Sequence, residues 1–253
     1  MSADILLAAA AAIALLMVTV WVVSLVVRDA SIVDIVWGAG FVVVAWVAIW
    51  RRGGPDPRSL LVAVLTTVWG LRLSGYLAWR NLGKGEDFRY QAMRRRHGDR
   101  FPLVSLATVF GLQGLLMWVV SLPVQVAAGD GLNVLDWVGA AVWLAGISFE
   151  ATGDAQLARF KADPANAGKV LDAGLWRYTR HPNYFGDFLV WWGLYLVAVA
   201  GGGWWAIVGP LVMSALLIRY SGAGLLEKTI ATRRPGYEEY TKRTNAFFPG
   251  PPR

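Results

Sequence analysis

The polar residues best suited to chemistry gather just before an apolar stretch in the C-terminal third of the chain. This segment reads Gly174-Leu-Trp-Arg-Tyr-Thr-Arg-His-Pro-Asn-Tyr-Phe-Gly-Asp187, and the apolar stretch predicts a helix that begins near Asn183. Cationic side chains beside a helix N-terminus favour an anion, and the segment supplies Arg177, Arg180 and His181. Its aromatic residues offer flat surfaces suited to a ring: Trp176, Tyr178 and Tyr184. Together they indicate a site for a nucleotide or another phosphate-bearing ligand.

Several ionisable residues stand inside otherwise apolar stretches or at their ends. A charge at the centre of a bilayer costs about 2.5–3.5 kcal/mol on the most lenient scale, so each of these residues is a candidate functional residue. Asp34 is the most isolated of them, and Trp37 shares its helical face. Others recur every four residues and so also share a face: Arg72 with Tyr76 and Arg80, Glu150 with Asp154, and Asn183 with Asp187. Capping or reaching the membrane interface is the simpler interpretation for Arg80, Lys84, Arg94–Arg96 and Arg100.

Composition excludes several classes of protein. The chain has 253 residues, of which 56% are hydrophobic and 16% charged, with no Cys and two His. Soluble domains are less apolar and more charged. Without Cys there are no disulfides, thiolate metal sites or Cys nucleophile, and two His exclude a multi-His metal site. The net charge of +7 fits cytoplasmic loops and a phosphate ligand better than nucleic acid.

The apolar stretches predict an all-α, polytopic membrane protein with seven transmembrane helices. A bilayer core of about 30 Å requires about 20 apolar residues per helix. Seven stretches meet this need approximately: 5–27, 32–50, 60–79, 103–127, 132–149, 184–200 and 204–218. No linker or internal repeat separates them, so residues 1–253 are expected to form a single integral-membrane domain.

The distribution of Lys and Arg predicts the orientation. Basic residues concentrate in segments 80–102, 161–182 and 219–253, whereas the connections at 129–131 and 201–203 contain none. We therefore expect the N-terminus outside and the C-terminus in the cytoplasm. Arg51, Arg52 and Arg58 oppose this orientation, because their connection would face outward.

Three motifs resemble the steroid 5-alpha-reductase family, in its bacterial branch. They are Arg180-His-Pro-Asn-Tyr-Phe-Gly-Asp187 with the preceding Gly174-Leu175-Trp176 and Tyr178, Arg80-Asn-Leu-Gly-Lys-Gly-Glu-Asp-Phe-Arg-Tyr90, and Phe247-Phe248-Pro249. The resemblance is strongest over residues 140–250. Related signatures occur in sterol reductases and isoprenylcysteine carboxyl methyltransferases, so the Arg-His-Pro core identifies the superfamily and not the reaction.

The resemblance implies an NADPH-dependent reductase of the bacterial inner membrane. Hydride would pass to an activated carbon–carbon double bond of a lipid-like substrate, a class that includes 3-oxo-Δ4-steroids. Residues 1–102 would form the substrate side. Residues 103–253 would hold NADPH at the cytoplasmic face, among the last three helices and their loops.

The resemblance also assigns cofactor contacts. Asn183 matches the residue that binds the nicotinamide amide, and Asp187 matches the acidic residue one turn later. The other implied contacts are Asp154, Lys161, Tyr178, Arg180, His181, Arg219 and Glu227. Arg89, Arg94 and Arg177 are further cations that could reach the phosphates.

Hydride addition to an enone leaves negative charge on the carbonyl oxygen, which needs a hydrogen-bond donor or a proton. The family uses a Glu on the second helix and a Tyr on the third. Asp34 is the nearest acidic residue here, so we expect it to be the proton donor, assisted by Tyr76 or by the indole N–H of Trp37.

Two rival functions stay open at this stage. One is an S-adenosylmethionine-dependent membrane methyltransferase of the isoprenylcysteine type, which shares the signature. The other is a non-catalytic transporter or assembly factor, which would need a polar path through both leaflets. The sequence also leaves open which lipid is the substrate and the oligomeric state.

Overall fold

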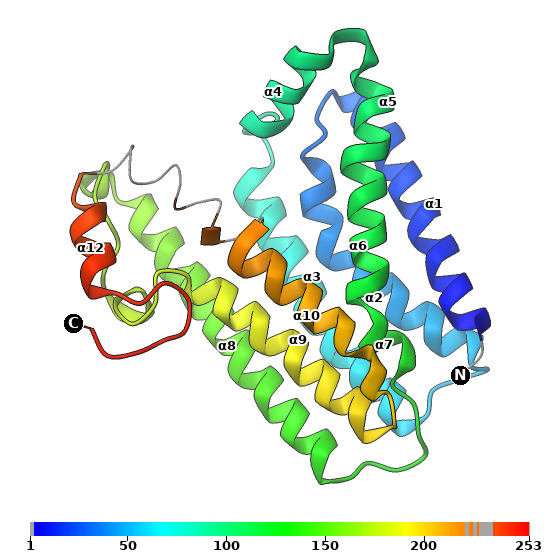
Figure 1. Ribbon diagram of the computed structural model, residues 1–253. Coiled ribbons are helices and arrows are strands. Elements are labelled where there is room, and N and C mark those ends of the chain that lie inside the picture. The colour runs from blue at the N-terminus through cyan, green and yellow to red at the C-terminus, as the bar shows by residue number, and fades with distance from the viewer. Residues whose placement is uncertain (1–2, 221–222, 225–226, 228–234, 253) are drawn as a thin grey trace. The chain divides into compact units, whose positions relative to one another are not determined.

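The computed structural model describes residues 3–220, 223–224, 227 and 235–252, and these residues are mostly helical (Figure 1). This confirms the all-α prediction. The described part of the chain contains no β-strand, only an isolated parallel bridge between Thr179 and Asn245. The α-helices are α1 Ala3–Val27, α2 Ile32–Arg51, α3 Pro57–Asn81, α4 Phe88–His97, α5 Phe101–Ser105, α6 Leu112–Val120, α7 Leu122–Val126, α8 Val134–Ala162, α9 Pro182–Ala200, α10 Val208–Ala215 and α12 Tyr237–Arg243.

Short helical turns complete the list: η1 Gly98–Arg100, η3 Pro164–Asn166, η4 Gly174–Arg177 and η5 Trp204–Ile207 are 3-10 turns. Two turns are π-helical, η2 Leu106–Gly111 and η6 Leu216–Tyr220. Local sequence explains where the polar connections end. Asp56 forms a capping box with Ser59 ahead of Pro57, and the Asp87 side chain accepts a hydrogen bond from Arg89 N–H at the start of α4.

Within the described residues, five helices are long and apolar enough to cross a membrane: Ala3–Val27, Ile32–Arg51, Pro57–Asn81, Phe88–Val120 and Val134–Ala162. They give the chain the character of a membrane protein, and exposed side chains such as Leu15 and Val26 suit contact with lipid. The predicted spans 184–200 and 204–218 correspond to α9 and to the shorter apolar helix Trp204–Tyr220, which are outside this set. The fourth span starts at Phe88 and not at residue 103, because α4 forms within the predicted polar loop and continues into the apolar helices that follow.

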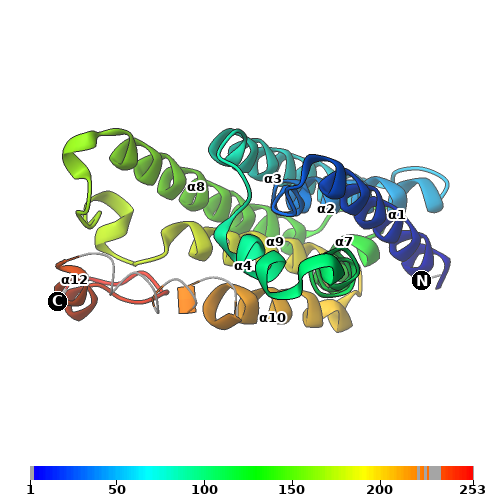
Figure 2. The same cartoon turned by 90° about the horizontal axis from the view of Figure 1, so that it is seen from above.

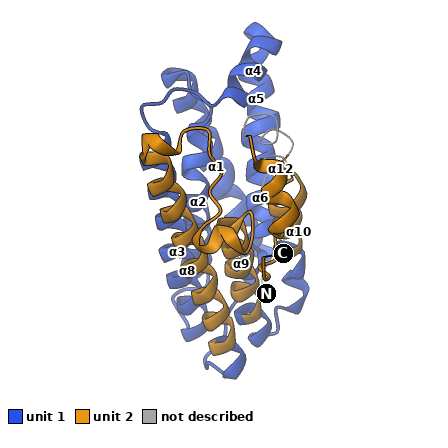
Figure 3. Cartoon of the chain, turned by 90° about the vertical axis from the view of Figure 1, so that its left-hand side faces the viewer, with its two compact units in different colours: residues 1–136, 197–209 blue, residues 137–196, 210–253 orange. Residues whose placement is uncertain are grey.

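The chain divides into two compact units (Figure 3). Unit 1 contains residues 1–136 and 197–209, and unit 2 contains residues 137–196 and 210–253. The division of roles expected after residue 102 stays a prediction.

In unit 1, α2 packs against both α1 and α3, as the view in Figure 2 shows. Two glycines allow the closest approach, because a Cβ built on Gly70 would lie 2.5 Å from the Gly38 carbonyl oxygen. Small residues serve this purpose generally in membrane helices. Phe41 and Trp69 fill the core beside this crossing, with ring centroids 5.7 Å apart.

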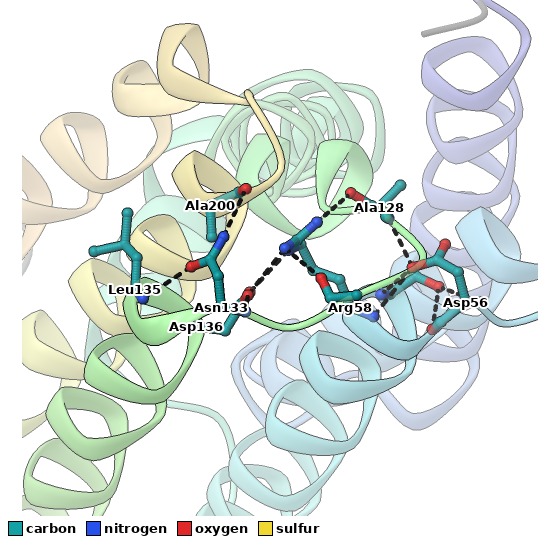
Figure 4. Close-up of polar contacts among 10 residues, drawn as sticks. Asp56, Arg58, Ala128, Asn133, Leu135, Asp136 and Ala200 are labelled. Atoms are coloured by element: carbon teal, nitrogen blue, oxygen red, sulfur yellow. Dashed lines mark hydrogen bonds and ion pairs between the residues drawn. The ribbon is translucent and has the colours of Figure 1, made fainter.

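A buried ion pair joins three connections at one end of unit 1 (Figure 4). Arg58 Nε lies 2.8 Å from Asp136 Oδ1, and Nη2 lies 2.9 Å from Oδ2. The same guanidinium donates to the carbonyl oxygens of Ala128 and Gly131, while Asn133 donates to the carbonyl oxygen of Ala200. Segments 52–58, 127–136 and 200–203 therefore meet at one place.

The opposite end of α2 brings two other connections together. The Ala30 N–H donates to Glu86 over 2.9 Å, and the Asp87 N–H donates to Ser31 Oγ over 3.3 Å. Successive connections in unit 1 therefore alternate between its two ends, as antiparallel membrane-spanning helices require.

In unit 2, glycines bring the backbones of α8 and α9 into contact. A Cβ on Gly146 would lie 2.7 Å from the Gly186 carbonyl oxygen, and one on Gly193 would lie 2.6 Å from Trp143 N. This close packing sets Gly153 beside Asn183 N and so brings the C-terminal half of α8 to the start of α9.

We expect Asp136→Ala to lower the free energy of unfolding by about 3–5 kcal/mol, because it leaves the buried Arg58 guanidinium without its counter-ion. Denaturation of the detergent-solubilised protein measures this. Asp130→Ala is the matched control, since Asp130 is exposed in the same connection. Equal, small effects of the two variants would show that the ion pair does not hold this end together.

Candidate functional site

The loop that carries the sequence motif of unit 2 is fixed to α8 and α12. Trp176 Nε1 donates to the Gly153 carbonyl oxygen over 3.1 Å, and the Leu175 N–H donates to Gln156 Oε1 over 3.0 Å. The Tyr240 hydroxyl donates to the carbonyl oxygen of Trp176. These hydrogen bonds hold the 3-10 turn η4 in place ahead of α9.

The C-terminal segment completes this anchoring. The Arg180 N–H donates to the Asn245 carbonyl oxygen over 2.9 Å, and the buried Thr179 hydroxyl donates to that of Phe247 over 2.7 Å. The Gly250 N–H donates back to the carbonyl oxygen of Tyr178 over 3.1 Å. The rings of Phe247 and Phe248 pack edge-on against α9 at Phe185 and Phe188. The Phe-Phe-Pro motif near the C-terminus thus packs against α9 beside the motif loop.

Arg180 and His181 converge on one carboxylate. Arg180 Nε lies 3.0 Å from Glu227 Oε1, and His181 Nε2 lies 3.1 Å from the same oxygen. Burial opposes ionisation of Glu227, but the hydrogen bond with His181 and the charge of Arg180 outweigh it and lower its pKa. His181 is buried and stacks on Tyr184 with ring centroids 5.6 Å apart. Three of the predicted cofactor residues therefore form one cluster.

A second pair joins α8 to the start of α9. Asn183 Nδ2 donates to Asp154 Oδ1 over 3.2 Å, and Asp154 is only 4% exposed. A carboxylate oxygen can only accept, so this bond orients the amide with its NH2 group toward Asp154. Within the described residues, Asn183 Oδ1 accepts no hydrogen bond and is left for another donor.

The other predicted contacts of unit 2 lie on α8, α9, η6 and the motif loop. Asp187 lies one turn beyond Asn183 on α9 and is partly buried. Lys161 at the end of α8, Tyr178 in the motif loop and Arg219 in η6 are exposed. Their cofactor contacts stay predictions.

The predicted acid of unit 1, Asp34, lies within a polar cluster drawn from three helices. Its Oδ2 lies 3.0 Å from Arg89 Nη2, and its Oδ1 accepts from the Tyr90 hydroxyl over 2.9 Å. Gln113 Nε2 approaches the same Oδ1 at 3.3 Å. A carboxylate, a phenol, an amide and a guanidinium together can bind or protonate the oxygen of a polar ligand group.

A clamp holds α4 so that Arg89 and Tyr90 reach Asp34. Arg94 binds Glu86 through two hydrogen bonds of 3.0 and 2.7 Å, and Glu86 also accepts from the Ala30 N–H. Burial opposes ionisation of Glu86, but these hydrogen bonds prevail and lower its pKa. Arg94 is thus tied to Glu86, and Arg89 also pairs with Asp87 at 2.8 Å. Both arginines, which the sequence offers to cofactor phosphates, make ion pairs within unit 1, and their phosphate contacts stay predictions.

The two predicted helpers of Asp34 have other surroundings. Tyr76 lies against the guanidinium groups of Arg72 and Arg80, 5.7 and 5.6 Å from its ring centroid. Trp37 packs edge-on against Phe41 at 5.2 Å. Sequence reasoning missed Tyr90 and Gln113, although a signal existed for each. Tyr90 ends the motif of residues 80–90, and Gln113 is a lone amide inside a predicted span.

The described residues include no group of three or more His, Asp or Glu side chains placed to hold an ion.

We expect Glu86→Gln to destabilise the protein in a pH-dependent way. Because the folded pKa lies below the ordinary value of 4.5, ionised Glu86 stabilises the fold fully above that pH, and this contribution is lost as pH falls through the lower folded pKa. Melting temperatures measured from about pH 7 downward should differ most between variant and wild type near neutrality. Glu238→Gln, at a largely exposed position, is the control. A constant difference at all pH values would refute the assignment.

Comparison with known proteins places this chain among proteins whose function is not established. The family model described as "Protein of unknown function (DUF1295)" matches residues 20–244. A curated relative, the uncharacterized protein C594.04c of Schizosaccharomyces pombe, is 26% identical over 220 residues. That alignment covers 76% of this chain and 63% of the relative, so the chain spans less than two thirds of that protein's length. No solved structure matches the chain. The family match covers most of the chain, including the Asp34 cluster and the motif loop, so the chain belongs to the DUF1295 family.

Proposed function

We propose that this protein is an NADPH-dependent membrane reductase that transfers a hydride to an activated carbon–carbon double bond of a lipid-like substrate. The observation that carries the proposal is the Asn183–Asp154 pair. Its hydrogen bond leaves Asn183 Oδ1 as an acceptor at the start of α9. A nicotinamide ring carries a carboxamide whose N–H groups are suitable donors for that oxygen.

The neighbouring residues suit the rest of such a cofactor. The motif loop adds Arg177, which is exposed, and Arg180, which is held by Glu227. Cations of this kind bind phosphate groups. NADPH, when bound, supplies the hydride, and the protein contributes orientation and charge.

The Asp34 cluster suits the oxygen on which charge develops. Reduction of an enone leaves negative charge on the carbonyl oxygen, and a donor fixed beside that oxygen lowers the barrier. We assign this role to Asp34 together with Tyr90, because the 2.9 Å hydrogen bond between them allows a proton to be shared. Gln113 and Arg89 orient the carboxyl group.

We also propose the finer topology of seven spans, with the N-terminus outside a bacterial inner membrane and the cofactor site facing the cytoplasm. The alternating connections of unit 1 support it. Two of the three arginines that oppose it are engaged by the protein: Arg58 is buried against Asp136, and Arg52 donates to the Gln125 carbonyl oxygen.

We expect the purified protein to bind NADPH, and Asp154→Asn to weaken that binding by about tenfold or more, because the amide of Asn183 loses its fixed orientation and a charged hydrogen-bond partner. Quenching of tryptophan fluorescence in detergent measures the affinity, and mass spectrometry identifies what copurifies. Asp130→Asn, in an exposed loop of unit 1, is the control. Tight binding of S-adenosylmethionine without binding of NADPH would overturn the reductase proposal in favour of a methyltransferase.

We expect Tyr90→Phe to slow substrate reduction by roughly 100-fold or more while NADPH affinity is retained, because general acid catalysis contributes factors of this size. The assay follows NADPH oxidation with a 3-oxo-Δ4-steroid, or with the lipid that copurifies. Tyr76→Phe is the comparison, since it removes the other candidate hydroxyl. A larger loss with Tyr76→Phe than with Tyr90→Phe would reverse the assignment.

A further inference from the structure

Two adjoining clefts open on the surface of unit 2. The larger has a volume of about 420 Å³, and Asp172, Gly174, Arg177 and Arg243 are among its lining residues. The smaller, of about 210 Å³, is lined by Arg180 and Lys242 among others. Arg243 and Thr244 belong to both linings, so the clefts share a wall.

The charge of the lining selects for an anion. Arg177, Arg180, Lys242 and Arg243 line the two clefts, and Asp172 is the only carboxylate among the described lining residues. A cleft with this excess of positive charge attracts a ligand that carries more than one negative charge.

The fold builds this wall from segments far apart in the sequence. The backbone hydrogen bond from Arg180 to Asn245 and the bridge between Thr179 and Asn245 set the motif loop beside the C-terminal segment. The 3-10 turn that contains Arg177 is tied to α8 through Trp176. The cationic residues therefore lie on backbone segments that hydrogen bonds hold in place.

The larger cleft contains an ion pair that a stronger anion can displace. Arg243 Nη2 lies 2.6 Å from Asp172 Oδ2, yet the two side chains are 51% and 48% exposed. An exposed pair of this kind contributes little free energy. Arg177, in the same lining, makes no ion pair with any residue that the structure describes. Two guanidinium groups thus line one cleft, one held by an exchangeable carboxylate.

A phosphate monoester matches this arrangement better than a phosphodiester does. A monoester carries nearly two negative charges near neutrality and presents three terminal oxygens, so two guanidinium groups can each bind it. Each phosphate of a dinucleotide's diphosphate bridge is bonded to a ribose through an ester and to the other phosphate through an anhydride, and it carries a single charge. The monoester of NADPH is its 2′-phosphate.

We propose that the larger cleft binds a phosphate monoester through Arg177 and Arg243, and that this monoester is the 2′-phosphate of NADPH, for which Asp172 competes. The inference rests on the proposed function and deepens it, because it names the residues that make the protein prefer NADPH to NADH. When no phosphate is bound, Asp172 forms the ion pair with Arg243.

Two nucleotides that differ only in the 2′-phosphate test the inference by binding alone. We expect the full-length protein in detergent to bind NADP+ about tenfold or more tightly than NAD+, which has no phosphate monoester, as charge-assisted hydrogen bonds require. Arg177→Gln and Arg243→Gln should remove this preference by weakening the binding of NADP+. Asp172→Asn should increase it, because the competing carboxylate is gone. Arg159→Gln, at an exposed position of α8, is the control.

The possible outcomes separate the two proposals. If NADPH binds but the preference is absent, or persists in both arginine variants, the cleft assignment is wrong and the reductase proposal stands. If neither nucleotide nor NADPH binds, the reductase proposal fails. A lipid headgroup is the other source of a phosphate monoester, so mixed micelles with phosphatidic acid or phosphatidylcholine form a second arm. Stabilisation by phosphatidic acid alone that is lost in both arginine variants would make a lipid the ligand and overturn the nucleotide assignment.

Discussion

A charged side chain among apolar helices is stable only beside a partner, and the Arg58–Asp136 ion pair is the case on which unit 1 most depends. Both residues are almost fully buried, and the guanidinium also satisfies two backbone carbonyl groups of the 127–136 connection. Removing either partner would leave the other charge in a medium that cannot solvate it. The pair therefore ties the start of α3 to the connection that precedes α8.

The same constraint builds both candidate sites. Asp34 lies beside Arg89, Glu86 beside Arg94, and Glu227 beside Arg180 and His181. The Glu86–Arg94 and Arg58–Asp136 pairs connect backbone segments, which is a structural role. The Asn183 pair differs, because it leaves the acceptor oxygen of Asn183 for a ligand. In the Asp34 cluster the phenol of Tyr90 and the amide of Gln113 both donate to one carboxylate oxygen, so a ligand would have to compete for these donors.

Unit 2 joins a close helix contact to an exposed, cationic surface. Glycines let α8 and α9 touch along their backbones, which brings Asp154 to Asn183. The C-terminal segment then pairs with the motif loop and adds Arg243 to the arginines that precede α9. An oriented amide and a cationic surface on one unit are the features that a phosphate-bearing, ring-containing cofactor requires. Membership in the DUF1295 family does not identify an activity, so the functional proposals depend on the chemistry of these residues.

The sequence by itself determined that the chain is helical and apolar enough for a membrane, where five of the spans lie, and which segment before α9 carries the motif. Hydrophobic periodicity and composition are local properties, and helices form from local hydrogen bonds. Only the tertiary structure decided which polar residues meet. Arg89, Tyr90 and Gln113 are 55, 56 and 79 residues from Asp34 in the sequence, and Asp172 is 71 residues from Arg243. Spacing along a helix cannot predict such pairs, because they depend on how helices pack and on where each buried charge finds its partner.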